Sequence, residues 1–235
     1  MISPDFQSFT YSFDEVAPTR AEIAEFIQTE SLDESHPAHF IVDELLDFLS
    51  AKADNIRGGY SIQEIANLEI KEGKISFGRD ILEIGVQIAA YLRGSSYAAL
   101  FVCTAGNIFT TLSTKYNTQG DYLEAYIADA IGSLTVENAM DKIQEQLSLA
   151  MSVYEMKISN RYSPGYCNWA LADQQNLFPL IGKNEIGVTL SASSLMTPIK
   201  SVSGLIGIGM QVKKRNYGCE VCNNKTCIYR KILNK

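Results

Sequence analysis

The residues with the clearest chemical potential form a short turn after a long helical pattern: Arg161-Tyr162-Ser163-Pro164-Gly165-Tyr166. Proline fixes one φ angle and glycine frees the next, so the chain turns sharply here. Gly165 would let a ligand lie against bare backbone, and Arg161 carries a planar donor fork suited to a carboxylate. The two tyrosines could stack on a flat ring or a cation. From the spacing alone, a plain surface turn with two half-buried tyrosines is the alternative.

A second segment, 37 positions after Arg161, is rich in small residues: Pro198-Ile199-Lys200-Ser201-Val202-Ser203-Gly204. Small side chains in a strand indicate close approach by another backbone or by a ligand. Gly204, Gly207 and Gly209 do not have the spacing of a dinucleotide fingerprint, and no helix follows them. The segment therefore predicts a strand and excludes a Rossmann-type site at this position.

A third candidate is a set of closely spaced cysteines near the C-terminus, Cys219, Cys222 and Cys227. Thiolates bind Zn²⁺ and iron–sulfur clusters strongly, and the surrounding lysines and arginines favour the thiolate form. Three ligands do not complete a tetrahedral site, so Cys167 is the candidate fourth ligand. Zinc and an iron–sulfur cluster both stay open, as do unligated thiols and a redox disulfide.

The elements that must position these residues are predicted from hydrophobic periodicity and turn residues. Residues 97–103 form an apolar run that predicts a buried strand, and residues 121–157 carry the longest helical stripe. We also expect strands in 1–18, 60–77, 186–190 and 201–212, with a hairpin turn at 71–74; helices over 19–28, 35–51, from 80, 107–116 and 171–181; and a loop over 159–167. Thr19 and Glu22 form a candidate capping box for the first helix, and Gly132 could kink or split the long one. This order predicts one α+β domain over residues 1–212 with a largely antiparallel sheet, and a basic, Cys-rich tail over 213–235.

Composition limits the possible partners and the cellular location. The chain has 235 residues, 46% of them apolar, and a net charge of −7, which disfavours nucleic acid as a partner. The tail has seven basic residues and one acidic residue, so charge is unevenly distributed and could orient docking. The longest apolar stretch, residues 97–103, is far shorter than the ~20 residues of a membrane span. With no secretory signal, we expect a soluble, cytoplasmic protein that does not bind membranes.

The first two motifs together resemble the activation domain of cobalamin-dependent methionine synthase. That family carries an Arg-x-x-Pro-Gly-Tyr loop, followed by a strand with Pro-x-x-Ser-Val-Ser-Gly in the same order. The long helix is also similar, with Asp121-Tyr122 near its start and Ala128-Asp129 further on. The likeness covers roughly residues 95–205, and it implies a curved α+β domain with a central, mostly antiparallel sheet and a long helix.

The resemblance also implies a ligand and the residues that hold it. Members of the family bind S-adenosylmethionine in a shallow groove formed largely by the Arg-x-x-Pro-Gly-Tyr loop. By carry-over, the main chain near Arg161 and Ser163 contacts the ligand, and Gly165 and Tyr166 shape the loop. The remaining implied ligand-binding positions are Pro164, Ser203, Asp129 and Glu137. The last two are candidates because the family often has a glutamate where this chain has Ser133.

The implied function is the reductive methylation of cob(II)alamin, which reactivates methionine synthase. A reductase supplies one electron, S-adenosylmethionine supplies the methyl group, and the protein contributes proximity rather than a general base or a nucleophile. Because no Asp-x-His-x-x-Gly motif is present, we expect the cobalamin to be held by a separate methionine synthase polypeptide. The chain would then belong to a methyltransferase system of methionine biosynthesis and act only with that partner. The alternatives are a reactivator of another corrinoid methyltransferase, or a non-enzymatic metal-binding interaction protein on the same fold.

Overall fold

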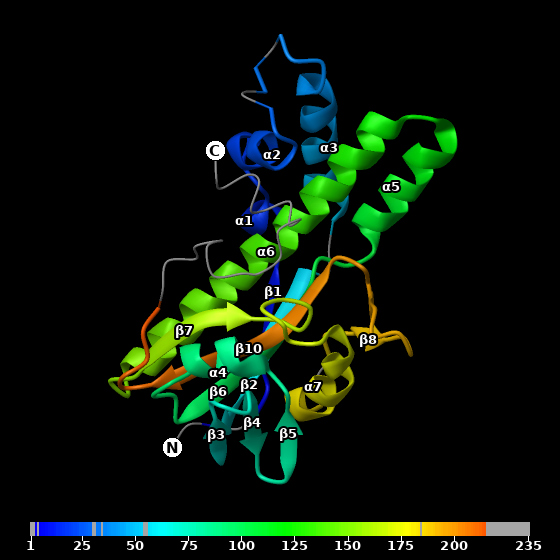
Figure 1. Cartoon of the computed structure of the whole chain (residues 1–235). Helices are drawn as coiled ribbons and strands as arrows, with labels where there is room; N and C mark the ends of the chain where they lie inside the picture. The colour runs from blue at the N-terminus through cyan, green and yellow to red at the C-terminus, as the bar shows by residue number, and fades with distance from the viewer. Residues whose placement is uncertain are drawn as a thin grey trace.

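The central element of the computed structural model is an antiparallel sheet of five strands in the order β1-β2-β6-β10-β7 (Figure 1). The structure describes residues 3, 5–29, 32–33, 35–53, 56–183 and 185–214. Within them the predicted α+β fold is confirmed. The strands are β1 (Gln7–Tyr11), β2 (Ile56–Glu64), β6 (Tyr97–Thr104), β10 (Ser201–Gly209) and β7 (Lys157–Tyr162). The central strand β6 is buried along nearly its whole length, which is why its sequence is a continuous apolar run.

One face of the sheet is covered by the long helix α6 (Tyr122–Ser152), with other helices packed around it. Its 31 residues correspond to roughly 46 Å at 1.5 Å per residue. The predicted kink at Gly132 does not end the helix, which runs through this residue, and a Cβ there would lie 2.6 Å from the Cβ of Phe109. Glycine at this position therefore allows α5 to pack closely on α6. The other helices on this side are α1 (Phe13–Val16), α2 (Arg20–Phe26), α3 (His39–Lys52) and α5 (Ile108–Gln119).

The opposite face of the sheet carries a separate apolar cluster that includes Leu100, Trp169 and Leu205. It is covered by smaller elements, among them a three-stranded antiparallel sheet and two short helices. These elements are β3 (Asn67–Glu69), β4 (Lys74–Phe77), β5 (Asp80–Leu82), α4 (Gly85–Tyr91), the 3₁₀ turn η1 (Leu171–Asp173) and α7 (Gln174–Ile181). A two-stranded ribbon, β8 (Thr189–Leu190) and β9 (Met196–Thr197), follows them along the chain. Two cores therefore enclose the sheet, one on each face.

Several local predictions are confirmed by the structure. Thr19 caps α2 in a capping box: its hydroxyl accepts the amide of Glu22 at 3.2 Å, and the Glu22 carboxylate accepts the amide of Thr19 at 2.7 Å. The predicted hairpin turn joins β3 to β4, and Gly73 adopts a φ of +68° there. Glycine tolerates that conformation without strain.

Other predictions of element type or boundary are wrong. The helix predicted from residue 80 is instead strand β5 followed by the shorter α4, because Gly85 takes a φ of +81° that separates the two. The predicted loop over 159–167 is strand β7 as far as Tyr162. The second helix begins at His39 rather than near residue 35. The predicted strand over 186–190 is reduced to the two residues of β8. No helix within the described ranges is both long and apolar enough to cross a bilayer.

Candidate functional site

The Pro-Gly turn leaves the end of β7, at the edge of the central sheet. Its fold depends on backbone hydrogen bonds: the amide of Gly165 donates to the carbonyl of Trp169 at 2.8 Å, and the amide of Trp169 donates to the carbonyl of Tyr166 at 2.9 Å. The amide of Tyr166 also donates to the carbonyl of Ser163 at 3.2 Å. Residues 163–169, named the ligand loop below, therefore form a closed turn. Pro164 is buried within it, Ser163 is half-buried, and Gly165 is exposed.

The ligand loop is held in an unusual backbone conformation. Gly165 has a φ of +95°, and the non-glycine residues Cys167 and Asn168 follow with φ angles of +49° and +66°. Left-handed conformations disfavour residues with a Cβ, so two in succession must be enforced by their surroundings. One neighbour is Gly85 at the start of α4, where a Cβ would lie 3.5 Å from the carbonyl oxygen of Cys167. The loop thus lies against the turn between β5 and α4.

Two exposed apolar side chains lie beside the glycine of the ligand loop. A Cβ on Gly165 would lie 3.6 Å from Cδ1 of Leu171, and Leu171 is 42% exposed. Tyr166 is 54% exposed. Exposed backbone beside exposed apolar surface can receive a ligand that combines a flat ring with polar groups.

Arg161 does not present its guanidinium to the loop. It lies on β7 opposite Ile206 of β10, and its side chain meets α6. Its Nη2 lies 2.6 Å from Oε2 of Glu137, and its Nη1 lies 2.5 Å from Oδ1 of Asp141. Burial lowers the pKa of the guanidinium, but the charges of Glu137 and Asp141 outweigh it, so the net pKa is raised. The arginine is firmly charged and joins the strand that leads into the loop to the long helix.

A second ion pair lies on α6, two turns before the first. Lys200 Nζ lies 2.7 Å from Oδ1 of Asp129 and donates to the hydroxyl of Ser133 at 2.9 Å. The Lys200 side chain is only 9% exposed, whereas that of Asp129 is 52% exposed. Ser133, which stands where the family often has a glutamate, therefore accepts a hydrogen bond from Lys200 in this chain. Sequence reasoning did not identify Lys200, although its place inside the small-residue segment was a usable signal.

Ser203 is placed on the opposite face of the sheet from Arg161. Its hydroxyl donates to Oε1 of Gln174 at 3.2 Å, and only 2% of the residue is exposed. Asp129 and Glu137 share one stripe of α6, while the ligand loop and Ser203 lie at β7 and β10. The predicted positions therefore form two groups: the α6 stripe with its cations, and the loop with its support.

The cysteines predicted as metal ligands fall largely outside the described residues. Cys219, Cys222 and Cys227 lie in the segment 215–235, which the structure does not describe. Cys167 is described, is half-buried and follows the exposed Tyr166. Among the described residues, no group of three or more His, Cys, Asp or Glu side chains is arranged to hold a metal ion. Cys103, expected in a buried strand, is fully buried in β6.

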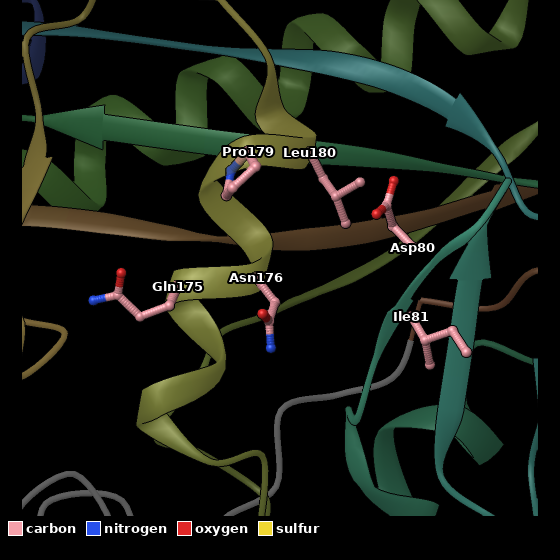
Figure 2. A pocket seen from close by; sticks show the side chains of 6 residues that line it. All are labelled: Asp80, Ile81, Gln175, Asn176, Pro179 and Leu180. Carbon is pink, nitrogen blue, oxygen red and sulfur yellow. The ribbon is translucent and has the colours of Figure 1, made fainter.

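A hollow of about 200 Å³ lies between β5 and α7 (Figure 2). It is lined by Asp80, Ile81, Gln175, Asn176, Pro179 and Leu180. Ligand pockets usually measure roughly 300–1,000 Å³, so this hollow is small for a nucleoside-sized molecule. Its wall residue Asn176 donates to Asp173 at 2.7 Å, a residue that the motifs did not indicate.

Comparisons with known proteins identify the fold and the family. The structure is similar to the crystal structure of the MetH reactivation domain bound to AdoHcy, with a TM-score of 0.62 and 15% sequence identity over 92% of this chain and 83% of that chain. The family model described as vitamin B12 dependent methionine synthase, activation domain, matches residues 87–228. The chain therefore belongs to the activation-domain family of vitamin B12-dependent methionine synthase. No curated protein matches the sequence.

Proposed function

We propose that the chain binds S-adenosylmethionine at the ligand loop and supports reductive methylation of cob(II)alamin held by a separate methionine synthase. The observation that carries the proposal is the closed Pro-Gly turn with an exposed Gly165 backbone, in a chain of this family. The similar reactivation domain was crystallised with AdoHcy, the product that remains when S-adenosylmethionine gives up its methyl group. That relationship supports the same class of ligand here.

The chemistry of the described residues fits such a ligand. The exposed Tyr166 and Leu171 offer apolar surface for a flat base beside Gly165, whose backbone is accessible. Asp129 is half exposed on α6 but already pairs with Lys200, so the attraction that its carboxylate offers to the ammonium and sulfonium charges of S-adenosylmethionine is reduced by that ion pair. The Arg161 guanidinium already binds Glu137 and Asp141. Contact near Arg161 is therefore assigned to the main chain of the loop rather than to the guanidinium.

The role of the chain in the reaction is to bind and orient. S-adenosylmethionine, when bound, supplies the methyl group, and an external reductase supplies the electron. A closed loop at a sheet edge holds a ligand in one orientation and presents its outer side to a docking partner. Positioning of this kind can lower the barrier of a two-component reaction by several kcal/mol. No acid or base from this chain enters the proposal.

Isothermal titration calorimetry with S-adenosylmethionine tests the proposal. We expect saturable binding to the full chain and competition by AdoHcy, with adenosine alone binding more weakly because it lacks the amino-acid portion. The second stage adds the chain to an oxidised methionine synthase with a reductant and measures recovered turnover. A folded sample that gives no binding to either nucleotide would refute the proposal.

Two further proposals concern the partner and the tail. The same chemistry would serve another corrinoid methyltransferase, and affinity capture with the full chain, followed by detection of bound corrinoid, separates the two partners.

We also propose that Cys219, Cys222 and Cys227, with Cys167, bind zinc or an iron–sulfur cluster, because four thiolates complete such a site. Metal analysis beside the nucleotide titration decides this point. Bound metal with no nucleotide binding would favour a metal-binding interaction protein.

A further inference from the structure

The side chain of Asp173 lies at the junction of three elements that meet behind the ligand loop. Its Oδ2 accepts the indole N–H of Trp169 at 2.7 Å and the amide of Glu83 at 3.2 Å. Its Oδ1 accepts the side-chain amide of Asn176 at 2.7 Å. The carboxylate thus joins the last residue of the loop, the turn before α4, and α7.

This carboxylate is buried, since only 8% of Asp173 is exposed. A buried carboxylate is costly unless donors satisfy its oxygens, and three donors do so here. A cluster of this kind tolerates little change, because removal of the acceptor leaves buried N–H groups without partners. Trp169 is 1% exposed, so its indole donor is among those groups.

Trp169 is also the residue that closes the ligand loop. Its carbonyl accepts the amide of Gly165, and its own amide donates to Tyr166. Between these contacts, Cys167 and Asn168 stay in the left-handed region. The backbone hydrogen bonds of Trp169 thus close the turn on both sides of these two residues, and its indole is held by burial and by Asp173.

We propose that Asp173 is a positioning residue for S-adenosylmethionine binding: through Trp169 it holds the ligand loop in the closed turn that receives the ligand. This inference rests on the proposed function of the loop. Asp173 itself does not contact the ligand. Asp173 also couples the ligand loop to α7 and to the β5–α4 turn, because its two carboxylate oxygens accept hydrogen bonds from all three.

The chain contains one tryptophan, so its fluorescence reports this residue alone. The experiment compares wild-type protein with Asp173→Ala and with the matched control Asn176→Ala. The control removes a donor to the same carboxylate and leaves the Trp169 contact in place. Each protein is titrated with S-adenosylmethionine, and quenching of its tryptophan emission by acrylamide is measured without ligand, at a temperature where circular dichroism shows it folded.

We expect Asp173→Ala to weaken S-adenosylmethionine binding about tenfold or more, as loss of a charge-assisted hydrogen bond would. Acrylamide quenching of Trp169 should rise in the same variant. Asn176→Ala should bind within about twofold of wild type, on the order expected when the loop contact survives. If Asp173→Ala fails to fold, Asp173→Asn serves instead. Its neutral amide oxygen is a weaker acceptor for the indole than a carboxylate, so we expect a smaller loss of binding and a smaller rise in quenching, both in the same direction, and no change in either would overturn the role.

The outcomes separate this inference from the function on which it rests. If the wild-type protein and the folded Asp173 variant bind S-adenosylmethionine equally well, the positioning role alone is overturned. The same holds if acrylamide quenches Trp169 equally in the two proteins. A wild-type chain that binds no S-adenosylmethionine overturns the proposed function and with it the role of Asp173 in binding. Weaker binding together with greater quenching, both absent from Asn176→Ala, supports the inference.

Discussion

The change from Gly165 to alanine tests whether the backbone conformation of the ligand loop determines ligand affinity. Gly165 has a φ of +95°, and Gly120, at the C-terminal end of α5, has a φ of +88°. A Cβ at Gly120 would meet nothing within 4 Å, and one at Gly165 would make only an ordinary contact with Leu171. The two glycines therefore form a matched pair in which strain, rather than a steric clash, is the cost of substitution.

The size of the effect follows from that strain. A residue with a Cβ in a left-handed conformation costs roughly 1–2 kcal/mol, which for a chain of this size lowers the melting temperature by about 2–8 °C. We expect the full decrease in Gly120→Ala and a smaller one in Gly165→Ala, because strain that the ligand loop releases by relaxing in the free protein no longer lowers its stability. Only Gly165→Ala should also weaken S-adenosylmethionine binding, because the loop relaxes in the free protein and must be strained again to bind. The same 1–2 kcal/mol corresponds to roughly 5- to 30-fold in dissociation constant.

Differential scanning fluorimetry and isothermal titration calorimetry on both variants measure the two quantities. The interpretation fails if Gly165→Ala binds S-adenosylmethionine within about twofold of wild type while it loses as much stability as Gly120→Ala, which is on the order of 1 kcal/mol. It fails as well if Gly120→Ala loses affinity by the same factor, because the effect would then be global.

Two other predictions concern stability. Asp129→Ala should lower the free energy of unfolding by about 2–3 kcal/mol, because it leaves the nearly buried Lys200 without its carboxylate. Lys200→Met should lower it by only about 1 kcal/mol, because the half-exposed Asp129 is then left in contact with water. Equal losses in urea denaturation would contradict this asymmetry. Burial raises the pKa of the Cys103 thiol to about 12. The contribution of this thiol to stability is therefore complete below pH ~9 and is lost as the pH rises toward 12, because the thiol ionises in the unfolded chain but not in the folded one. Cys103→Ala should flatten that alkaline decline in a pH series of denaturation curves, and an unchanged slope would exclude Cys103 as its source.

Sequence patterns predicted the elements whose role is local or fully apolar. The capping box at Thr19, the buried strand β6 and the long helix each follow from residue types within a few positions of one another. The Arg-x-x-Pro-Gly-Tyr turn and the small-residue strand motif were together sufficient to indicate the family, which the family model confirms.

Strand β7 was missed because two of its four buried residues, Ser159 and Asn160, are polar and interrupt its apolar pattern. Ser159 is fully buried: its hydroxyl accepts the amide of Gly207 at 2.8 Å and donates to the carbonyl of Asn160. Arg161 is neutralised by two carboxylates from α6. Gly207 and the two carboxylates lie 20 or more positions away in the chain, so no hydrophobic periodicity could show the strand. Distance also concealed part of the surroundings of Asp173, since one of its three donors is the amide of Glu83, 90 positions earlier.

The long helix carries both ion pairs of the site on a single rigid rod. Asp129 faces Lys200, and Glu137 faces Arg161 two turns later. A slide or roll of α6 would therefore disturb both contacts together, and neither β7 nor the start of β10 can shift against the helix independently of the other. The tip that α6 forms with α5 projects beyond the sheet (Figure 1). A displacement of this tip would therefore be transmitted along α6 to the strand that leads into the ligand loop.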